Sequence, residues 1–151
     1  MSFRPIGSLK GMTIQHLNPY LMFNGDAEAA LALYESALGA KRERVMRYGD
    51  AAGMNQPAGL ENRIAHASVQ IGESTILMSD APPSNPVPAE GNVQISLDFR
   101  DEREMAKAFD ALAAGGKVTH PLKDMFWGAK WGTLTDAHGI RWMFNSAKEA
   151  A

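Results

Sequence analysis

The spacing of apolar residues predicts two helices, one in each half of the chain. Within residues 26–38 apolar side chains recur at helical spacing, at Ala27, Leu31, Tyr34 and Leu38. The same spacing follows Asp101, at Met105, Ala108, Phe109 and Leu112. Asp101 with Glu104 three residues later forms a capping-box-like start for the second helix. Glycines at 39 and 115–116 predict where the two helices end.

Short segments of alternating or continuous apolar character predict the strands. Those of the first half are 16–24, 41–48, 63–71 and 74–79, and those of the second half are 92–99, 117–121, 130–135 and 140–145. Each half therefore has the order β-α-β-β-β, which is an α+β fold with a helix covering one face of a small sheet. The other face must be buried by the opposite half or by a partner chain.

The two halves also resemble each other residue by residue. Residues 23–41 align with residues 99–117 at an offset of 76, and seven of the 19 positions are identical, among them Phe23/Phe99, Gly39/Gly115 and Lys41/Lys117. Two Ala-rich helices can match by composition alone, but the flanking Phe, Gly and Lys keep the same register. We therefore expect one domain, residues 1–151, with repeats 16–80 and 92–146 joined by a proline-rich linker, 80–91. Paired repeats tend to enclose a concave site.

The amino-acid composition excludes several classes of function. The net charge of −2 and the scattered Lys and Arg give no electrostatic case for nucleic acid or for an anionic membrane. The absence of Cys removes disulfides and thiolate chemistry and fits a cytoplasmic protein. The N-terminus shows no export signal, and no apolar run is long enough to span a bilayer. The chain also lacks a Gly-x-Ser-x-Gly element, a P-loop and a dinucleotide-binding glycine pattern.

Several segments together resemble the vicinal oxygen chelate superfamily of glyoxalases, bleomycin-resistance proteins and dioxygenases, and within it the PhnB-like branch. They are Pro19-Tyr20-Leu21 with Phe23-Asn24-Gly25, LYESALGA, Ile64-Ala65-His66-Ala67, Leu77-Met78-Ser79-Asp80 and, most specifically, GGKVTHPLKDMFWGAKWGTLTDAHGIRW. The last combines Gly-Gly-Lys-Val-Thr, Phe-Trp-Gly and Asp-x-x-Gly-x-x-Trp in order. The resemblance covers about residues 16–146. It implies paired β-α-β-β-β modules, a U-shaped mixed sheet around a cavity, and a homodimer.

The metal-dependent members of this superfamily place ligands, mostly His and Glu, at four strand positions. Carried across one by one, these positions fall near Asn18 or Pro19, near Met78 or Ser79 with Asp80 one residue beyond, near Gln94, and near Met143. None matches convincingly, so we expect no metal and no other cofactor. Some relatives have been labelled demethylubiquinone methyltransferase-like, yet the chain lacks a glycine-rich strand-to-helix turn for S-adenosylmethionine.

The candidate ligand-binding residues are aromatic or polar: Tyr20, His66, Asp80, Gln94, Phe126, Trp127 and Trp142. Large rings can stack on a flat ligand, although they can also fill the core. His66 lies in the middle of a predicted strand. It either faces the cavity or is a hydrogen-bonded histidine of the core or its rim. For His120 and His138 a structural role is expected, and His16 stays unassigned. Gln94, Ser96 and Asp98 share one strand face, toward either solvent or the cavity.

Three functions remain open. The first is a metal-independent protein of the PhnB-like type that binds a small molecule as a homodimer, with no catalysis required. The second is a divalent-metal lyase, isomerase or dioxygenase with an atypical ligand set, such as His66 with Asp80 and Gln94. The third is a structural or regulatory dimer whose cavity is filled by its own side chains.

Overall fold

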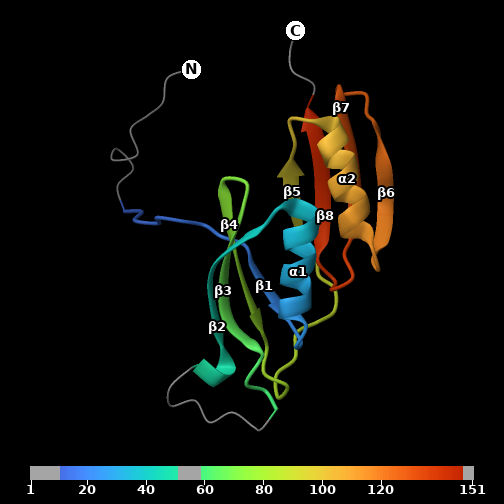
Figure 1. Cartoon of the computed structure of the whole chain (residues 1–151). Helices are drawn as coiled ribbons and strands as arrows, with labels where there is room; N and C mark the ends of the chain where they lie inside the picture. Colours follow the sequence, from blue (N-terminus) through green and yellow to red (C-terminus); the bar gives the residue numbers. More distant parts are fainter. Residues whose placement is uncertain (1–10, 51–58, 148–151) are drawn as a thin grey trace.

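The computed structural model describes residues 11–50 and 59–147 and shows two modules of the same order (Figure 1). The first contains β1 (Tyr20–Phe23), α1 (Ala27–Leu38), β2 (Lys41–Arg47), a short 3-10 turn (Tyr48–Asp50), β3 (Ile64–Ile71) and β4 (Ser74–Asp80). The second contains β5 (Gln94–Asp98), α2 (Glu102–Ala113), β6 (Lys117–Asp124), β7 (Ala129–Thr135) and β8 (Arg141–Ala147). The α+β class and the two β-α-β-β-β modules are confirmed.

Each module forms its own four-stranded sheet, in the order β1-β4-β3-β2 and β5-β8-β7-β6. In both sheets the first strand pairs parallel with the last one, and the remaining pairs are antiparallel. The short strands β1 and β5 each form one edge of their sheet, and β2 and β6 form the other edges. The internal repeat predicted this shared topology, since equivalent patterns occupy equivalent strands.

Prolines lie at two places where the strand boundaries differ from the expected ones. Pro19 directly precedes β1, so that this strand begins at Tyr20 and not at residue 16. Pro121 lies within β6, which runs on to Asp124, and the pairing with β7 is irregular between His120 and Lys123. A proline cannot donate to a strand partner, and it is tolerated here because β6 is an edge strand.

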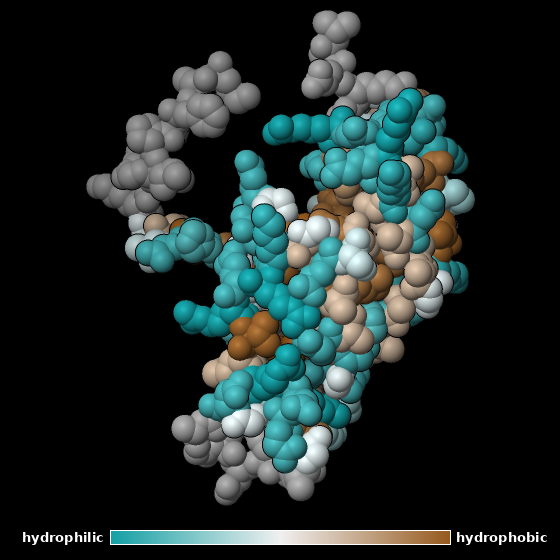
Figure 2. Space-filling model, viewed as in Figure 1, coloured by the Kyte–Doolittle hydropathy of each residue, from teal (hydrophilic) through white to brown (hydrophobic). Residues whose placement is uncertain are grey.

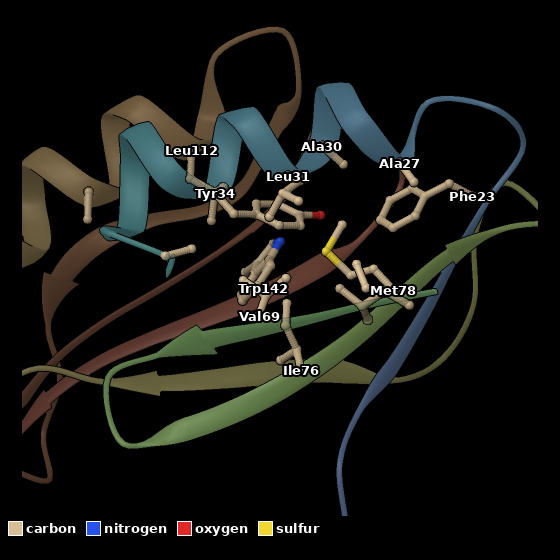
Figure 3. Close-up of a cluster of buried hydrophobic side chains, with 14 of the residues drawn as sticks. Phe23, Ala27, Ala30, Leu31, Tyr34, Val69, Ile76, Met78, Leu112 and Trp142 are labelled. Atoms are coloured by element: carbon tan, nitrogen blue, oxygen red, sulfur yellow. The ribbon is translucent and has the colours of Figure 1, made fainter. Parts of the chain in front are cut away.

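The two helices contact each other, and their apolar stripes share one core with the helix-facing sides of both sheets. Figure 3 shows Leu31 and Tyr34 of α1 lying over Val69 and Ile76 of the first sheet and beside Trp142 of the second. Trp142 is fully buried, and its ring meets that of Tyr34 edge-on at 5.2 Å. In the same view as Figure 1, mildly hydrophobic residues gather where the helices lie, while the first sheet shows mostly hydrophilic residues with a small hydrophobic patch among them (Figure 2).

The helix starts differ in a way that affects the site. Asp101 caps α2, accepting hydrogen bonds from the backbone N–H groups of Arg103 and Glu104, as the capping pattern predicted. Asp26 occupies the same position in α1 but makes no capping hydrogen bond. The carboxylate of Asp26 is therefore available for another partner. No helix in the described part of the chain is long and apolar enough to cross a membrane.

Candidate functional site

The first sheet presents an uncovered face on the side away from α1. Leu21 and Phe23 are buried beneath the helix, whereas Tyr20 and Met22 point to the opposite face and are 44% and 38% exposed. His66 of β3 lies on the same face as Tyr20. Its Nδ1 is 3.4 Å from the Tyr20 hydroxyl oxygen, and the two rings are 6.0 Å apart. This surface, which carries Tyr20 and His66 together with other polar side chains such as Ser68 and Ser79, is the open face of the first sheet.

The second sheet has an equivalent open face, which carries an aromatic cluster. Trp131 of β7 lies opposite Asn145, on the side away from the buried Phe144. Its ring is 5.2 Å from that of His120 and 6.3 Å from that of Trp127. Gln94, Ser96 and Asp98 of β5 are exposed, as the predicted polar stripe requires.

A tight turn between β6 and β7 carries Phe126 and Trp127. The Met125 N–H donates to the Ala129 carbonyl at 2.8 Å, and Gly128 closes the turn with a φ of 86°. Phe126 is 95% exposed and Trp127 is 50% exposed, and their rings meet edge-on at 4.9 Å. The turn therefore offers two large apolar surfaces to a ligand or to another molecule.

Two of the candidate residues lie in the core. Asp80 accepts hydrogen bonds from the backbone N–H groups of Gly25, Ala27 and Ile64 at 2.8, 3.0 and 2.9 Å, so it anchors the start of α1 from β4. The indole N–H of Trp142 donates to Asp136 at 2.9 Å. Their polar atoms are thus bonded within the chain and are not free to contact a ligand.

The remaining candidates fall into two groups within one chain. Tyr20 and His66 belong to the first sheet, and Gln94, Phe126 and Trp127 belong to the second sheet or its β6–β7 turn. No strand of one sheet pairs with a strand of the other. The structure therefore brings Tyr20 and His66 together, and Phe126 and Trp127 together. Gln94 pairs with Arg141, at the end of the second sheet opposite to the β6–β7 turn, and the two sheets' candidates are not joined within one chain.

The residues at the four ligand positions do not fit a divalent metal ion. Asn18 and Pro19 precede β1 and bond to backbone groups of β4. Met78 is fully buried, and the Ser79 hydroxyl donates to the Met22 sulfur at 3.1 Å. The other two positions, Gln94 and Met143, offer an amide and a thioether. In residues 11–50 and 59–147, no three His, Asp or Glu side chains gather as a metal site would require.

A second concave region lies between the modules and encloses about 680 Å³. Its wall includes the end of β1, residues 87–90 of the linker, the start of β6 and the turn between β7 and β8. Within it, His138 Nδ1 lies 2.6 Å from Oδ2 of Asp26, whose side chain makes no capping hydrogen bond to its own helix. This pair connects the start of α1 to the β7–β8 turn. We call this region the inter-module cleft.

Asp136 holds the turn that carries His138. Its Oδ1 accepts the backbone N–H groups of His138 and Ile140 at 2.8 and 3.1 Å, and its Oδ2 accepts from the Tyr34 hydroxyl at 2.6 Å and from Trp142. Burial, and then the neighbouring Asp136 carboxylate, raises the pKa of Tyr34 above its ordinary value. Tyr34 is therefore a protonated donor at neutral pH, and His138 is presented from a rigid turn.

The pairing of Asp26 with His138 was not found by sequence reasoning. The two residues are 112 positions apart, and His138 was expected to have only a turn role. No local spacing links them, because the contact forms only when the two modules pack. The sequence has an aspartate before each helix. That pattern predicts a helix cap at both positions and does not show that Asp26 would bond elsewhere.

Comparison with known proteins agrees with this architecture. Residues 13–144 match the family model described as glyoxalase/bleomycin resistance protein/dioxygenase superfamily. The chain is 36% identical over 142 residues to protein YjdN of Escherichia coli K12, which covers 88% of this chain and 96% of that protein.

Among solved structures, protein PA1353 from Pseudomonas aeruginosa superimposes with a TM-score of 0.80 at 34% identity, covering 90% of this chain and all of that one. A Bacillus cereus structure described as a putative 3-demethylubiquinone-9 3-methyltransferase, PhnB protein, gives a TM-score of 0.71 at 24% identity, with 88% and 100% covered. At 24% identity, the Bacillus cereus structure supports the fold alone. The resemblance to the PhnB-like branch is therefore confirmed as a likeness of fold.

Proposed function

Because this chain belongs to the glyoxalase/bleomycin resistance protein/dioxygenase superfamily, we propose that it binds a small molecule without a metal ion, at a site shared by two copies. The observation that carries the proposal is the exposure of Phe126 and Trp127, at 95% and 50%, beside the open face of the second sheet. Aromatic rings left this accessible offer large flat surfaces for stacking.

Polar groups on the open faces would orient the ligand. Gln94 offers an amide donor and acceptor on the same sheet as Trp127. Tyr20 and His66 offer a hydroxyl and an imidazole next to each other on the other sheet. A few polar groups among apolar and aromatic surface are typical of small-molecule sites.

A second copy would complete the site. Both open faces expose apolar side chains, including Met22 and Met46 on the first sheet and Trp127 beside the second. Both sheets also end in an unpaired edge strand, β1 or β5. Placing β1 of one copy beside β5 of the other would bring the open face with Tyr20 and His66 next to the open face with Gln94. It would also cover two exposed edges.

The donor chemistry supports metal-independent binding. The four strand positions offer thioether, hydroxyl and amide groups where a divalent ion needs imidazoles and carboxylates. Asp80 is the nearest carboxylate along the chain, and three backbone N–H groups already occupy its oxygens.

Native mass spectrometry of gently purified protein, repeated under denaturing conditions, tests the proposal. We expect a dimer that carries no stoichiometric metal and retains an organic mass that is lost on denaturation. The Trp127→Ala variant should lose that mass, whereas Leu17→Ala, which removes an 89% exposed apolar side chain outside the sheets, should keep it. One divalent ion per chain would refute metal independence. A monomer would refute the shared site, and a ligand-free dimer would favour a structural role.

A further inference from the structure

The Asp26–His138 pair fixes the orientation and the tautomer of the imidazole. A carboxylate only accepts hydrogen bonds, so at 2.6 Å from Asp26 the Nδ1 of His138 must carry a proton and donate it. In a neutral imidazole the other nitrogen, Nε2, is then left with its lone pair free to accept. The Phe23 ring meets the imidazole edge-on at 6.3 Å and limits its rotation.

The Nε2 atom of His138 is accessible from the cleft. Among the described residues it has no hydrogen-bond partner, and every buried side-chain nitrogen or oxygen in these segments does have one. Nε2 is therefore not buried. Since the ring lines the inter-module cleft and its side chain is 15% exposed, the free nitrogen opens into that space.

Two cations flank the same cleft, on β6 and β8, with β7 between them. Lys117 pairs with Thr135, and Thr135 pairs with Arg141, so these residues form one row across β6, β7 and β8. All three line the cleft. Within the described segments no carboxylate lies within 4 Å of the Lys117 amine or of the Arg141 guanidinium. Arg141 uses Nη1 to donate to the Gly91 carbonyl and keeps its other donors.

Three carboxylates also line the cleft, and in the described segments none of them forms a salt bridge with Lys117 or Arg141. Asp136 is buried and accepts four hydrogen bonds, and Asp26 is bonded to His138. Glu90 is contributed by the linker. Lys117 and Arg141 thus supply two positive charges that no neighbouring carboxylate in the described segments neutralises by direct contact.

The linker wall of the cleft is built with specific contacts. The Asn24 side chain bonds to both backbone groups of Val87, at 2.9 Å each. Gly139 packs so closely that a Cβ there would collide with the Ala89 carbonyl oxygen. The volume of about 680 Å³ falls within the range of about 300–1,000 Å³ that is usual for ligand pockets.

We propose that the inter-module cleft is a second binding site, for a small molecule with an anionic oxygen group such as a carboxylate or a phosphate. Lys117 and Arg141 hold the anionic group, and Asp26 aims His138 so that Nε2 accepts a hydrogen bond from a hydroxyl or amine of the ligand. None of Tyr20, His66, Gln94, Phe126 and Trp127 lines this cleft. Its wall does include Met22, from the open face of the first sheet, and Arg141, the strand partner of Gln94, so the cleft adjoins the open faces.

Nuclear magnetic resonance on protein with ¹⁵N-labelled histidine tests the proposal directly. Before any addition, the His138 spectrum should show the tautomer with the proton on Nδ1. Titration with inorganic phosphate and, separately, with malonate should then shift the His138 signals saturably with at least one of them, and the arm that saturates identifies the preferred anion. Absence of a saturable shift with both anions, or the opposite tautomer, would overturn the proposal.

The internal repeat offers a matched control for the charge. Lys41 begins β2 as Lys117 begins β6, and the two are equivalent in the repeat, but only Lys117 lines the cleft. We expect Lys117→Gln and Arg141→Gln each to weaken anion binding about tenfold or more, and Lys41→Gln to leave it unchanged. Thermal unfolding confirms that each variant is folded. Equal binding by Lys117→Gln and Lys41→Gln would show that the anion is not held in the cleft.

Discussion

The Tyr34 hydroxyl is a single group that couples the two modules, and its removal has a calculable cost. It donates to Asp136 at 2.6 Å, and the Tyr34 and Asp136 residues are only 0% and 3% exposed. A hydrogen bond to a charged group contributes about 1.5–3 kcal/mol to stability. Phenylalanine fills nearly the same space, and Asp136 keeps its other three donors. Tyr34→Phe should therefore lower the free energy of unfolding by about 1.5–3 kcal/mol.

The same variant should change how stability depends on alkaline pH. Burial and the Asp136 charge raise the pKa of Tyr34 in the folded state, whereas in the unfolded chain it is ordinary, about 10. The protonated hydroxyl thus stabilises the fold fully below about pH 10. Above that pH the unfolded chain releases the proton and the folded chain retains it, so stability falls by about 1.4 kcal/mol per pH unit. Phenylalanine has no proton to release, so the Tyr34→Phe variant lacks this contribution to the fall of the unfolding free energy with pH.

Urea unfolding at a series of pH values, followed by tryptophan fluorescence, measures both effects. Burial also raises the pKa of Tyr48, which contributes in the wild type and in the variant alike and cancels in their comparison. Tyr20→Phe is the matched control, because Tyr20 is 44% exposed and lies on an open face. If Tyr34→Phe ran parallel to the wild type at alkaline pH, with an unchanged unfolding energy, the coupling described for Tyr34 and Asp136 would be wrong.

Three other substitutions test the local structure. Asp80→Asn should cost roughly 2–4 kcal/mol in urea unfolding, because an amide cannot accept all three backbone N–H groups that the carboxylate holds. Gly139→Ala should lower the melting temperature more than Gly72→Ala: both have a positive φ, but only at 139 would the new Cβ meet the Ala89 carbonyl oxygen. Asp101→Ala should lose stability at neutral pH yet show a weaker acid dependence. Backbone hydrogen bonds lower the pKa of Asp101, so its contribution is present above the ordinary carboxyl pKa and disappears as pH falls through the lowered value. Equal melting temperatures for the two glycine variants, or unchanged curves for either aspartate variant, would contradict these expectations.

The local features of the chain were readable from sequence because they depend on neighbours in the chain. Helical spacing predicted α1 and α2, and the glycines at 39 and 115 both adopt the left-handed conformation, with φ of 67° and 75°. The Asp101 cap involves residues only two and three positions away. The repeat predicted two modules of one topology, and the family resemblance identified the fold they form.

The site depended on contacts that no local pattern contains. Alternation along β4 and β8 separates two faces but does not say which one a helix covers, so Asp80 and Trp142 looked like cavity residues although both are buried. Asp26 and Asp101 have the same position before their helices, yet only Asp101 caps its helix. At the start of α1 the Asp80 side chain, from β4, accepts the Ala27 N–H instead. Asp26 then meets His138 across 112 residues. The sequence alone determined the elements and their order, and the packing of one module on the other decided which polar groups became partners, since hydrogen-bond geometry exists only after distant segments come together.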